Sequence, residues 1–319
     1  MKQLNIIGLR LLTTFLATML VPGAVLAASA LEVLERAEEA PRRVSYRGFK
    51  TATVYLRGDP TTAVLKVVHL KPDKTRTEYF TPSLLAGVVV IEDGSELWRY
   101  DPHEDEWEPI HVRLINRQLN CDDQHLQTGC EHISKNYDVR LIGTDSIAGR
   151  SAYVIQAIPK YQGETGRRLW IDREFFLIIG TQIEKPNGSV VSSSRFTKLQ
   201  FNPNDISPAL FKPSGRVKSV PNAESVRLHP MKPSYIPKGY RLVGISHLVA
   251  DRCLSLHMKF SNGMNTISLF QHKSDVKANC RLSEKRTSGI LTWQRSGMQF
   301  TLIGDLPRTE LQKIADSVR

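Results

Sequence analysis

The sequence of 319 residues lacks the common catalytic motifs that spacing alone reveals. It contains no G-x-S-x-G nucleophile elbow, no H-E-x-x-H zinc motif, no P-loop and no G-x-G-x-x-G dinucleotide loop. The nine histidines are scattered, and surface or structural roles explain them more simply than a shared set of ligands. These absences make an enzyme the least favoured class and favour a protein that acts by binding.

Long apolar runs are also scarce, and the most prominent one covers residues 11–26. Lys2 and Arg10 give the start of the chain positive charge, and compact residues precede Ala27, as signal peptidase requires. The run is shorter than the about 20 residues of a transmembrane helix. We therefore predict that residues 1–27 are a signal peptide cleaved near Ala27 and that the mature protein works outside the cytoplasm. An uncleaved anchor is the alternative.

The chain has only four cysteines, all after the predicted signal: Cys121, Cys130, Cys253 and Cys280. An even number in an exported protein is typical of disulfides. Of the three possible pairings, Cys121–Cys130 with Cys253–Cys280 is favoured, because each closes a loop within one predicted domain. A zinc site is the alternative in the segment with Cys121, His125, Cys130 and His132. Its spacing matches no common zinc pattern, so we predict neither metal nor another cofactor.

Acidic residues are outnumbered, 32 against 43 basic ones, which gives a formal net charge of +11. A basic protein can bind nucleic acid, acidic protein segments or anionic lipid head groups. Export removes most of the opportunity for nucleic acid and leaves anionic partners of the cell envelope. Basic clusters are candidates for the rim of such a site, although solvated faces are the simpler explanation. They comprise Arg42, Arg43, Lys71, Lys74, Arg76, Arg167 and Arg168.

Aromatic residues in the amino-terminal half are candidates for a ligand cavity. A curved sheet with one helix often leaves an apolar hollow that accepts a lipid chain or peptide side chains. Ordinary core packing is the alternative for each of them. The candidates are Tyr46, Phe49, Trp98, Tyr100 and Trp170.

The mature chain begins with a helix. Ser29 and Glu32 have the spacing of a capping box, and Leu31, Leu34 and Ala37 follow at helical intervals. We expect the helix to end before Pro41, because proline disfavours helical geometry in the residue before it.

A period of two follows the helix and predicts a large antiparallel sheet. Turns are expected at Asp93-Gly94, at 148–150 and at Asn187-Gly188. Residues 102–135 show little period and are predicted to be a long excursion, with a short helix near 112–118. The predicted strands are 44–56, 63–70, 76–80, 87–91, 96–100, 137–142, 151–158, 167–172, 177–185 and 189–201.

Seven prolines between Pro203 and Pro237 mark a change in composition that is typical of a linker. Strands are predicted beyond it, at 240–248, 253–260, 266–271, 289–295 and 299–304, and a final helix starts at Pro307. The fold class is therefore α+β, with a helix packed on a large antiparallel sheet and a second, smaller α+β domain. The predicted divisions are a sheet domain at 28–202, a linker at 203–236 and a carboxyl-terminal domain at 237–319.

Four segments in this order carry a resemblance to a known family: 142–150 (IGTDSIAGR), 168–172 (RLWID), 237–240 (PKGY) and 303–307 (IGDLP). With the export signal and opening helix, they resemble the MucB/RseB family of periplasmic sigma-E regulatory proteins. The resemblance implies a half-open β-barrel similar to the lipoprotein carriers LolA and LolB, joined to a smaller domain. The four cysteines and the 102–135 excursion depart from that pattern and leave the partner-binding surface open.

The resemblance also implies a partner, the periplasmic segment of a membrane-spanning anti-sigma factor. In the family the protein shields that factor from site-1 proteolysis, and lipopolysaccharide or mislocalised lipoprotein relieves the shielding. The favoured function is thus a negative regulator of an envelope-stress sigma factor that senses lipid or lipoprotein acyl chains. A periplasmic carrier of lipid or lipoprotein is the alternative. The oligomeric state stays open.

Overall fold

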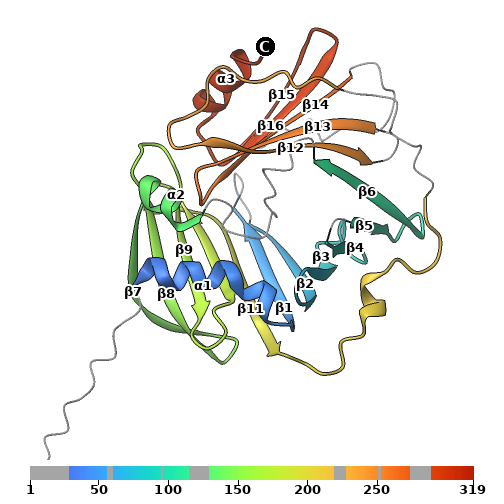
Figure 1. Cartoon of the computed structure of the whole chain (residues 1–319), viewed down its shortest axis with the longest axis vertical. Helices are drawn as coiled ribbons and strands as arrows, with labels where there is room; N and C mark the ends of the chain where they lie inside the picture. Colours follow the sequence, from blue (N-terminus) through green and yellow to red (C-terminus); the bar gives the residue numbers. More distant parts are fainter. Residues whose placement is uncertain are drawn as a thin grey trace, which may run out of the picture.

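The computed structural model describes residues 29–55, 60–94, 96–114, 129–218, 228–250, 253–273 and 289–319. The strands in these ranges form one antiparallel sheet of sixteen strands (Figure 1). We call β1–β11 the first part of the sheet and β12–β16 the second part; they join where β6 pairs with β12. The predicted signal peptide lies outside these ranges. None of the described helices combines the length and apolar character needed to cross a membrane.

Helix α1 (Ala30–Arg43) lies across the concave side of the first part (Figure 1). The predicted capping box is present: Glu32 N donates to Ser29 Oγ at 3.2 Å, and Ser29 N donates to Glu32 Oε2. The expected end before Pro41 is wrong, because the helix continues to Arg43. Pro41 loses only its own N–H bond, and Val44 N still donates to the carbonyl of Ala40 at 3.0 Å.

The first part of the sheet is largely a meander in which successive strands pair. Within the first part, the one pairing between strands that are far apart in the sequence joins β1 to β11. The strands are β1 (Tyr46–Val54), β2 (Thr61–Leu70), β3 (Lys74–Thr81), β4 (Val89–Asp93), β5 (Glu96–Asp101), β6 (Glu106–Leu114), β7 (Tyr137–Ile147), β8 (Arg150–Pro159), β9 (Gly166–Asp172), β10 (Ile178–Glu184) and β11 (Val190–Phe201). All ten predicted strands have a counterpart here.

Strand β6 corrects the predicted 102–135 excursion. Residues 106–111 pair with β5 and residues 111–114 pair with β12, so the helix expected from Val112 is wrong over 112–114. Trp107 is buried against Val68, Val89 and Ile91. Pairing with the preceding strand β5 and with the distant strand β12 makes this proline-containing segment a strand. Helix α2 (Gly129–Asn136) then packs beside α1, and residues 115–128 lie outside the described ranges.

The described residues of the proline-rich segment pack against the first part. A 3₁₀ helix, η2 (Pro208–Phe211), buries Phe211 in the cluster around Trp107. Beyond it, Trp107 N donates to Arg216 O at 2.8 Å and Lys218 N donates to Trp107 O at 2.7 Å. These contacts hold this stretch of chain along the edge of β6.

The second part of the sheet has its own core. Leu256, Met258, Leu269 and Phe300 are fully buried there, and Ile314 of the last helix packs on them. The elements are β12 (Arg241–Ala250), β13 (Cys253–Ser261), β14 (Thr266–Lys273), β15 (Ile290–Arg295), β16 (Met298–Gly304) and α3 (Arg308–Asp316). The predicted fold class is confirmed: a large antiparallel sheet with a packed helix, and a smaller sheet with a helix of its own.

Candidate functional site

The concave face of the first part borders a cavity of about 530 Å³. Strands β1–β3 and β9–β11 form its wall, α1 covers one side, and the turn between β13 and β14 reaches it from the second part. Hydroxyl groups such as those of Thr75 and Thr181 interrupt a mainly apolar lining. The apolar side chains include Leu65, Val67, Leu169, Ile178, Phe196 and Met264.

Strand geometry decides which side chains reach this cavity. Tyr46, Lys50 and Ala52 share one face of β1 because alternate residues of a strand point the same way. Lys50 lies opposite Leu65 on β2 and opposite Phe196 on β11, and both of those line the cavity too. The wall is thus built from facing positions on neighbouring strands.

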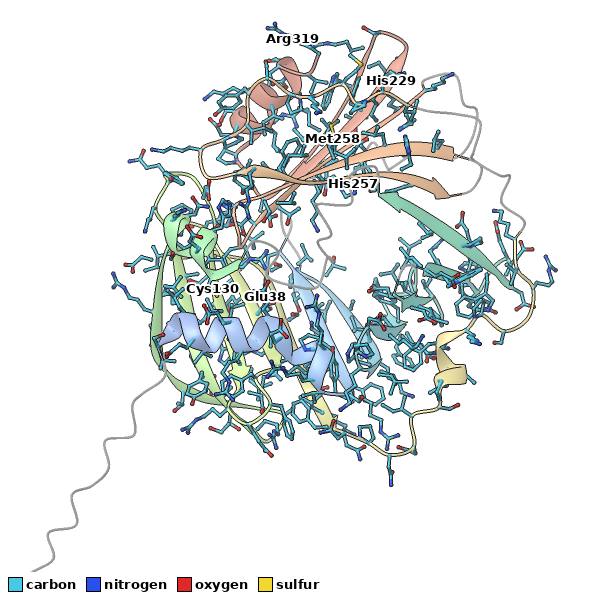
Figure 2. The ribbon with its side chains drawn as sticks, in the orientation of Figure 1. Glu38, Cys130, His229, His257, Met258 and Arg319 are labelled. Atoms are coloured by element: carbon cyan, nitrogen blue, oxygen red, sulfur yellow. The ribbon has the colours of Figure 1, made fainter. Side chains whose placement is uncertain are left out.

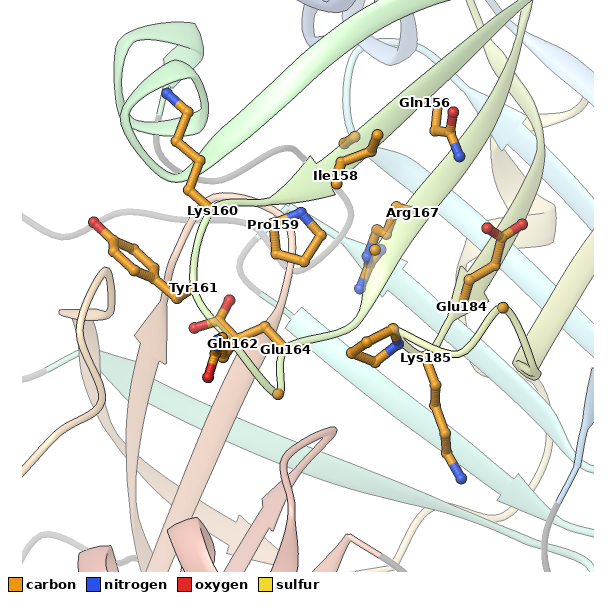
Figure 3. Close-up of a pocket in the computed structure, with 15 residues that line it drawn as sticks. Gln156, Ile158, Pro159, Lys160, Tyr161, Gln162, Glu164, Arg167, Glu184 and Lys185 are labelled. Atoms are coloured by element: carbon orange, nitrogen blue, oxygen red, sulfur yellow. The ribbon is translucent and has the colours of Figure 1, made fainter.

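A second cavity, of about 620 Å³, lies at the ends of β8–β11 (Figure 3). The β8–β9 connection supplies Lys160, Tyr161 and Glu164, and the β10–β11 turn supplies Lys185. Arg167, at the start of β9, lines both this cavity and the concave one. Arg167 is thus a lining residue that the two cavities share.

The β13–β14 turn closes one end of the concave cavity. Met264 packs into the core that α1 forms with the sheet. Asn265, which is 1% exposed, donates from Nδ2 to the Tyr137 hydroxyl and to the carbonyl and hydroxyl of Thr165, each at 3.0 Å. Its Oδ1 accepts from Arg167 Nε at 3.3 Å. A buried polar network thus connects the second part to the cavity wall.

Two basic side chains, Lys50 and Arg167, line the concave cavity. Burial lowers the pKa of each, although Tyr137, Asp305 and Tyr240 act in the opposite direction on Arg167. Within the described residues, neither basic group forms an ion pair with a carboxylate; Lys50 lies over the Phe196 ring at 5.6 Å. The site is a hollow in which apolar side chains and hydroxyl groups surround two basic side chains.

The five predicted aromatic residues divide between several places. Tyr46 lines the cavity. Trp170 is buried on the other face of β9, where its indole N–H donates to Asp145 Oδ2 at 2.8 Å. Phe49 is exposed beside Phe80, and Trp98 and Tyr100 pack around Trp107. The structure therefore brings one of the five to the concave cavity.

Of the seven predicted rim residues, Arg167 alone lines the cavity. The others have local partners: Arg42 and Arg43 lie beside Glu39, Lys71 donates to the carbonyl of Arg43, Lys74 pairs with Asp93, Arg76 donates to the carbonyl of Leu210, and Arg168 pairs with Glu184. These six do not form one basic rim.

The cysteines are only partly described. Cys130 is a free, buried thiol on α2, and Figure 2 labels it near Glu38 of α1. Its Sγ lies 3.7 Å from the carbonyl oxygen of Leu31. Cys121, Cys280 and the side chain of Cys253 lie outside the described residues, so the two disulfides stay predictions. Nowhere in the described ranges do three His, Cys, Asp or Glu side chains gather as metal ligands.

Sequence reasoning missed Lys50 and the β13–β14 turn. Lys50 could have been found from the sequence, because it shares a strand face with Tyr46. Lysine is unusual on the buried face of a strand. Nothing local pointed to Asn262 or Asn265, because their partners lie about a hundred positions earlier in the chain.

A family model and several relatives identify one family. The model for the MucB/RseB N-terminal domain matches residues 29–220. The sigma-E factor regulatory protein RseB of Salmonella typhimurium is 21% identical over 241 residues, which are 72% of this chain and 73% of that protein. The sigma factor AlgU regulatory protein MucB of Pseudomonas aeruginosa is 22% identical over 97% of this chain and 96% of its own length.

Solved structures show a similar fold. The crystal structure of MucB matches with a TM-score of 0.65 and 19% identity, over 91% of this chain and 97% of its own. The crystal structure of MucB in complex with MucA(peri) matches with a TM-score of 0.58 and 19% identity, over 91% and 98%. At such low identity these likenesses concern the fold alone.

Proposed function

The chain belongs to the MucB/RseB family, and on that premise we propose that it is a negative regulator of an envelope-stress sigma factor. It acts by binding the periplasmic part of a membrane anti-sigma factor. One observation carries the proposal: the chain shares the fold of MucB over 91% of its length, and MucB has been crystallised with MucA(peri). Relatives from two further genera carry the name of sigma-E regulators.

The proposal places the mature protein in the periplasm, exported by residues 1–27. It requires binding and no catalytic step. The divisions at 28–202, 203–236 and 237–319 belong to the same proposal, with the junction between the two parts of the sheet as the place where a partner can be held or released. Removal of residues 1–27, with Lys2 and Arg10, leaves a formal net charge of +9, which favours an acidic partner segment.

The proposal also includes the sensing of a lipid ligand. The cavity beneath α1 supports it, because the apolar side chains that line it beside hydroxyl and basic groups can contact an acyl chain. Lipopolysaccharide or an acylated lipoprotein is the ligand that we expect to release the anti-sigma factor.

The test is calorimetric titration of the mature protein with the periplasmic segment of an anti-sigma factor encoded beside its gene. We expect a dissociation constant of about 1 μM or tighter, weakened by lipopolysaccharide. A scrambled segment of the same charge is the control. Equal binding of the scrambled segment, or none of the native one, contradicts the regulator.

A periplasmic carrier of lipid or lipoprotein is the second candidate, and the concave cavity is the observation that favours it. A carrier delivers its cargo to an acceptor. Acylated peptide that copurifies with the protein and passes to acceptor vesicles, without any binding to the anti-sigma segment, would support the carrier.

A further inference from the structure

Arg167 has unused hydrogen-bonding capacity inside the molecule. A guanidinium has five N–H donors, and in the described residues Arg167 donates only through Nε, to Asn265. Its nearest electrostatic partners are Tyr137, Tyr240 and Asp305, and Asp305 lies beyond ion-pair distance. The remaining donors, on the two terminal nitrogens, belong to a side chain that lines two cavities.

This arrangement differs from that of the neighbouring arginine. Arg168 lies on the opposite face of β9 and pairs with Glu184 at 3.3 Å. A buried charge is costly unless it is paired, and a guanidinium fork matches the two oxygens of a carboxylate or phosphate. Arg167 therefore has the geometry of a receptor for an anion, with Nε fixed by Asn265.

The wall around Arg167 favours an acyl chain over a peptide. The strands β1, β2, β3, β9, β10 and β11 are all interior strands, and each pairs with a neighbour on both sides. Their backbone groups are used within the sheet, so a peptide placed there would leave its own N–H and C=O groups without partners. An acyl chain needs no such partners, and Leu65, Leu169 and Ile178 supply apolar contact.

We propose that Arg167 binds the anionic head group of an amphiphile whose apolar chain occupies the concave cavity. The head group is a carboxylate or a phosphate, both of which fit the fork of terminal nitrogens. Lys50, on the far side of β10 and β11 from β9, adds positive charge to the same cavity. The inference deepens the ligand-sensing part of the proposed function and rests on it for its biological use, whereas the binding itself needs no anti-sigma factor.

The test measures displacement of a fluorescent acyl probe from the mature protein by four oleoyl amphiphiles, each kept below its micellar concentration. Oleate carries a carboxylate, lysophosphatidate a phosphate, lysophosphatidylcholine a zwitterion, and monoolein no charge. We expect oleate, lysophosphatidate or both to bind about tenfold more tightly than monoolein. The tighter of the two identifies the head group. Equal affinity for monoolein and both anionic amphiphiles overturns the proposal.

The matched variants are Arg167→Gln and Arg168→Gln, which remove one charge from opposite faces of the same strand. We expect Arg167→Gln to remove the preference for the anionic head group, so that oleate and lysophosphatidate bind no more tightly than monoolein. Arg168→Gln should keep the preference within about twofold. Loss of the preference in both variants would show a net-charge effect and contradict a receptor at Arg167.

Two further outcomes are decisive. If Arg167→Gln does not fold, as shown by circular dichroism, Lys50→Gln takes its place: we expect the preference to survive, and its loss would assign the head group to Lys50 and overturn the proposal. Displacement of the probe by an acidic peptide, with no amphiphile binding, overturns it in favour of a peptide site. The anti-sigma segment is absent from this experiment. A negative result here therefore contradicts the head-group site and does not contradict the proposed regulator, which is tested separately by titration with that segment.

Discussion

Asn262, in the turn between β13 and β14, donates from Nδ2 to Oε2 of Glu164 at 2.7 Å. Glu164 is 3% exposed and Asn262 is fully buried, so this bond joins the two parts of the sheet away from water. Burial raises the pKa of the Glu164 carboxyl to about 7, and the bond from Asn262 offsets only part of that rise.

Glu164 makes stability depend on pH. Its ordinary pKa is 4.5, so between about pH 4.5 and 7 the folded protein binds more protons at this group than the unfolded chain does. The free energy of unfolding therefore falls as pH rises through that window. Glu164→Gln keeps an oxygen that accepts from Asn262 but cannot ionise. We expect the variant to gain stability relative to the unmodified protein from pH 5 to pH 8, measured by urea denaturation.

The control for that experiment is Glu35→Gln on the exposed side of α1. It should keep the pH profile of the unmodified protein. A Glu164→Gln variant with the same profile would show that this carboxyl does not titrate differently in the folded state.

Asn265 is predicted to stabilise the junction. Replacing it with alanine removes two N–H donors that serve three acceptors, removes the acceptor for Arg167, and leaves the buried carbonyl of Thr165 without this partner. We expect Asn265→Ala to lose about 1–3 kcal/mol of unfolding free energy in urea denaturation. Asn187→Ala, in the exposed β10–β11 turn, should lose less than about 1 kcal/mol. Equal losses would contradict a special role for the junction.

Trp170 is expected to stabilise the fold without contacting a ligand. Its indole N–H donates to Asp145, and the guanidinium of Arg195 lies 4.3 Å from its ring centroid. Trp170→Phe should cost about 1–2 kcal/mol of stability and leave affinity for an acyl probe unchanged. Tyr46→Leu, inside the cavity, should change that affinity. If Trp170→Phe binds the probe more weakly at unchanged stability, Trp170 contributes to the binding site.

Cys130 is predicted to resist thiol reagents in the folded protein. Burial and the negative charges of Glu35 and Glu38 raise the pKa of its thiol to about 11, so little thiolate forms at neutral pH. We expect alkylation of Cys130 to be slow in native protein and fast in urea, as followed by mass spectrometry. A Cys121–Cys130 peptide in a non-reducing digest would instead establish the disulfide expected from sequence.

Local patterns accounted for most elements of the fold. The period of two located the strands, Asn187-Gly188 marked the β10–β11 turn, and the Ser29 capping box began α1. The same reasoning missed β6, where Ile110, Val112 and Leu114 alternate with polar residues but Pro109 interrupts the pattern; pairing with β5 and β12 makes the segment a strand. Family resemblance, carried by short segments in both halves, identified the MucB/RseB family from the sequence.

The candidate site was much less accessible to sequence reasoning. Tyr46 and Arg167 were the two predicted site residues that reach the concave cavity. The sequence shows that an aromatic residue in a strand is suited to burial. Which face of the curved sheet the residue occupies depends on the register of the strand. Trp170 and Leu169 are neighbours in sequence and lie on opposite faces of β9.

The sequence by itself determined the class of the fold, because helix caps, strand alternation and turns are properties of a few neighbouring residues. Only the tertiary structure decided where positive charge is buried. Arg167 Nε donates to Asn265, which lies 98 positions later in the chain. Arg167 also lines two cavities whose walls come from distant segments. Such contacts form when distant segments pack together, and no local pattern records them.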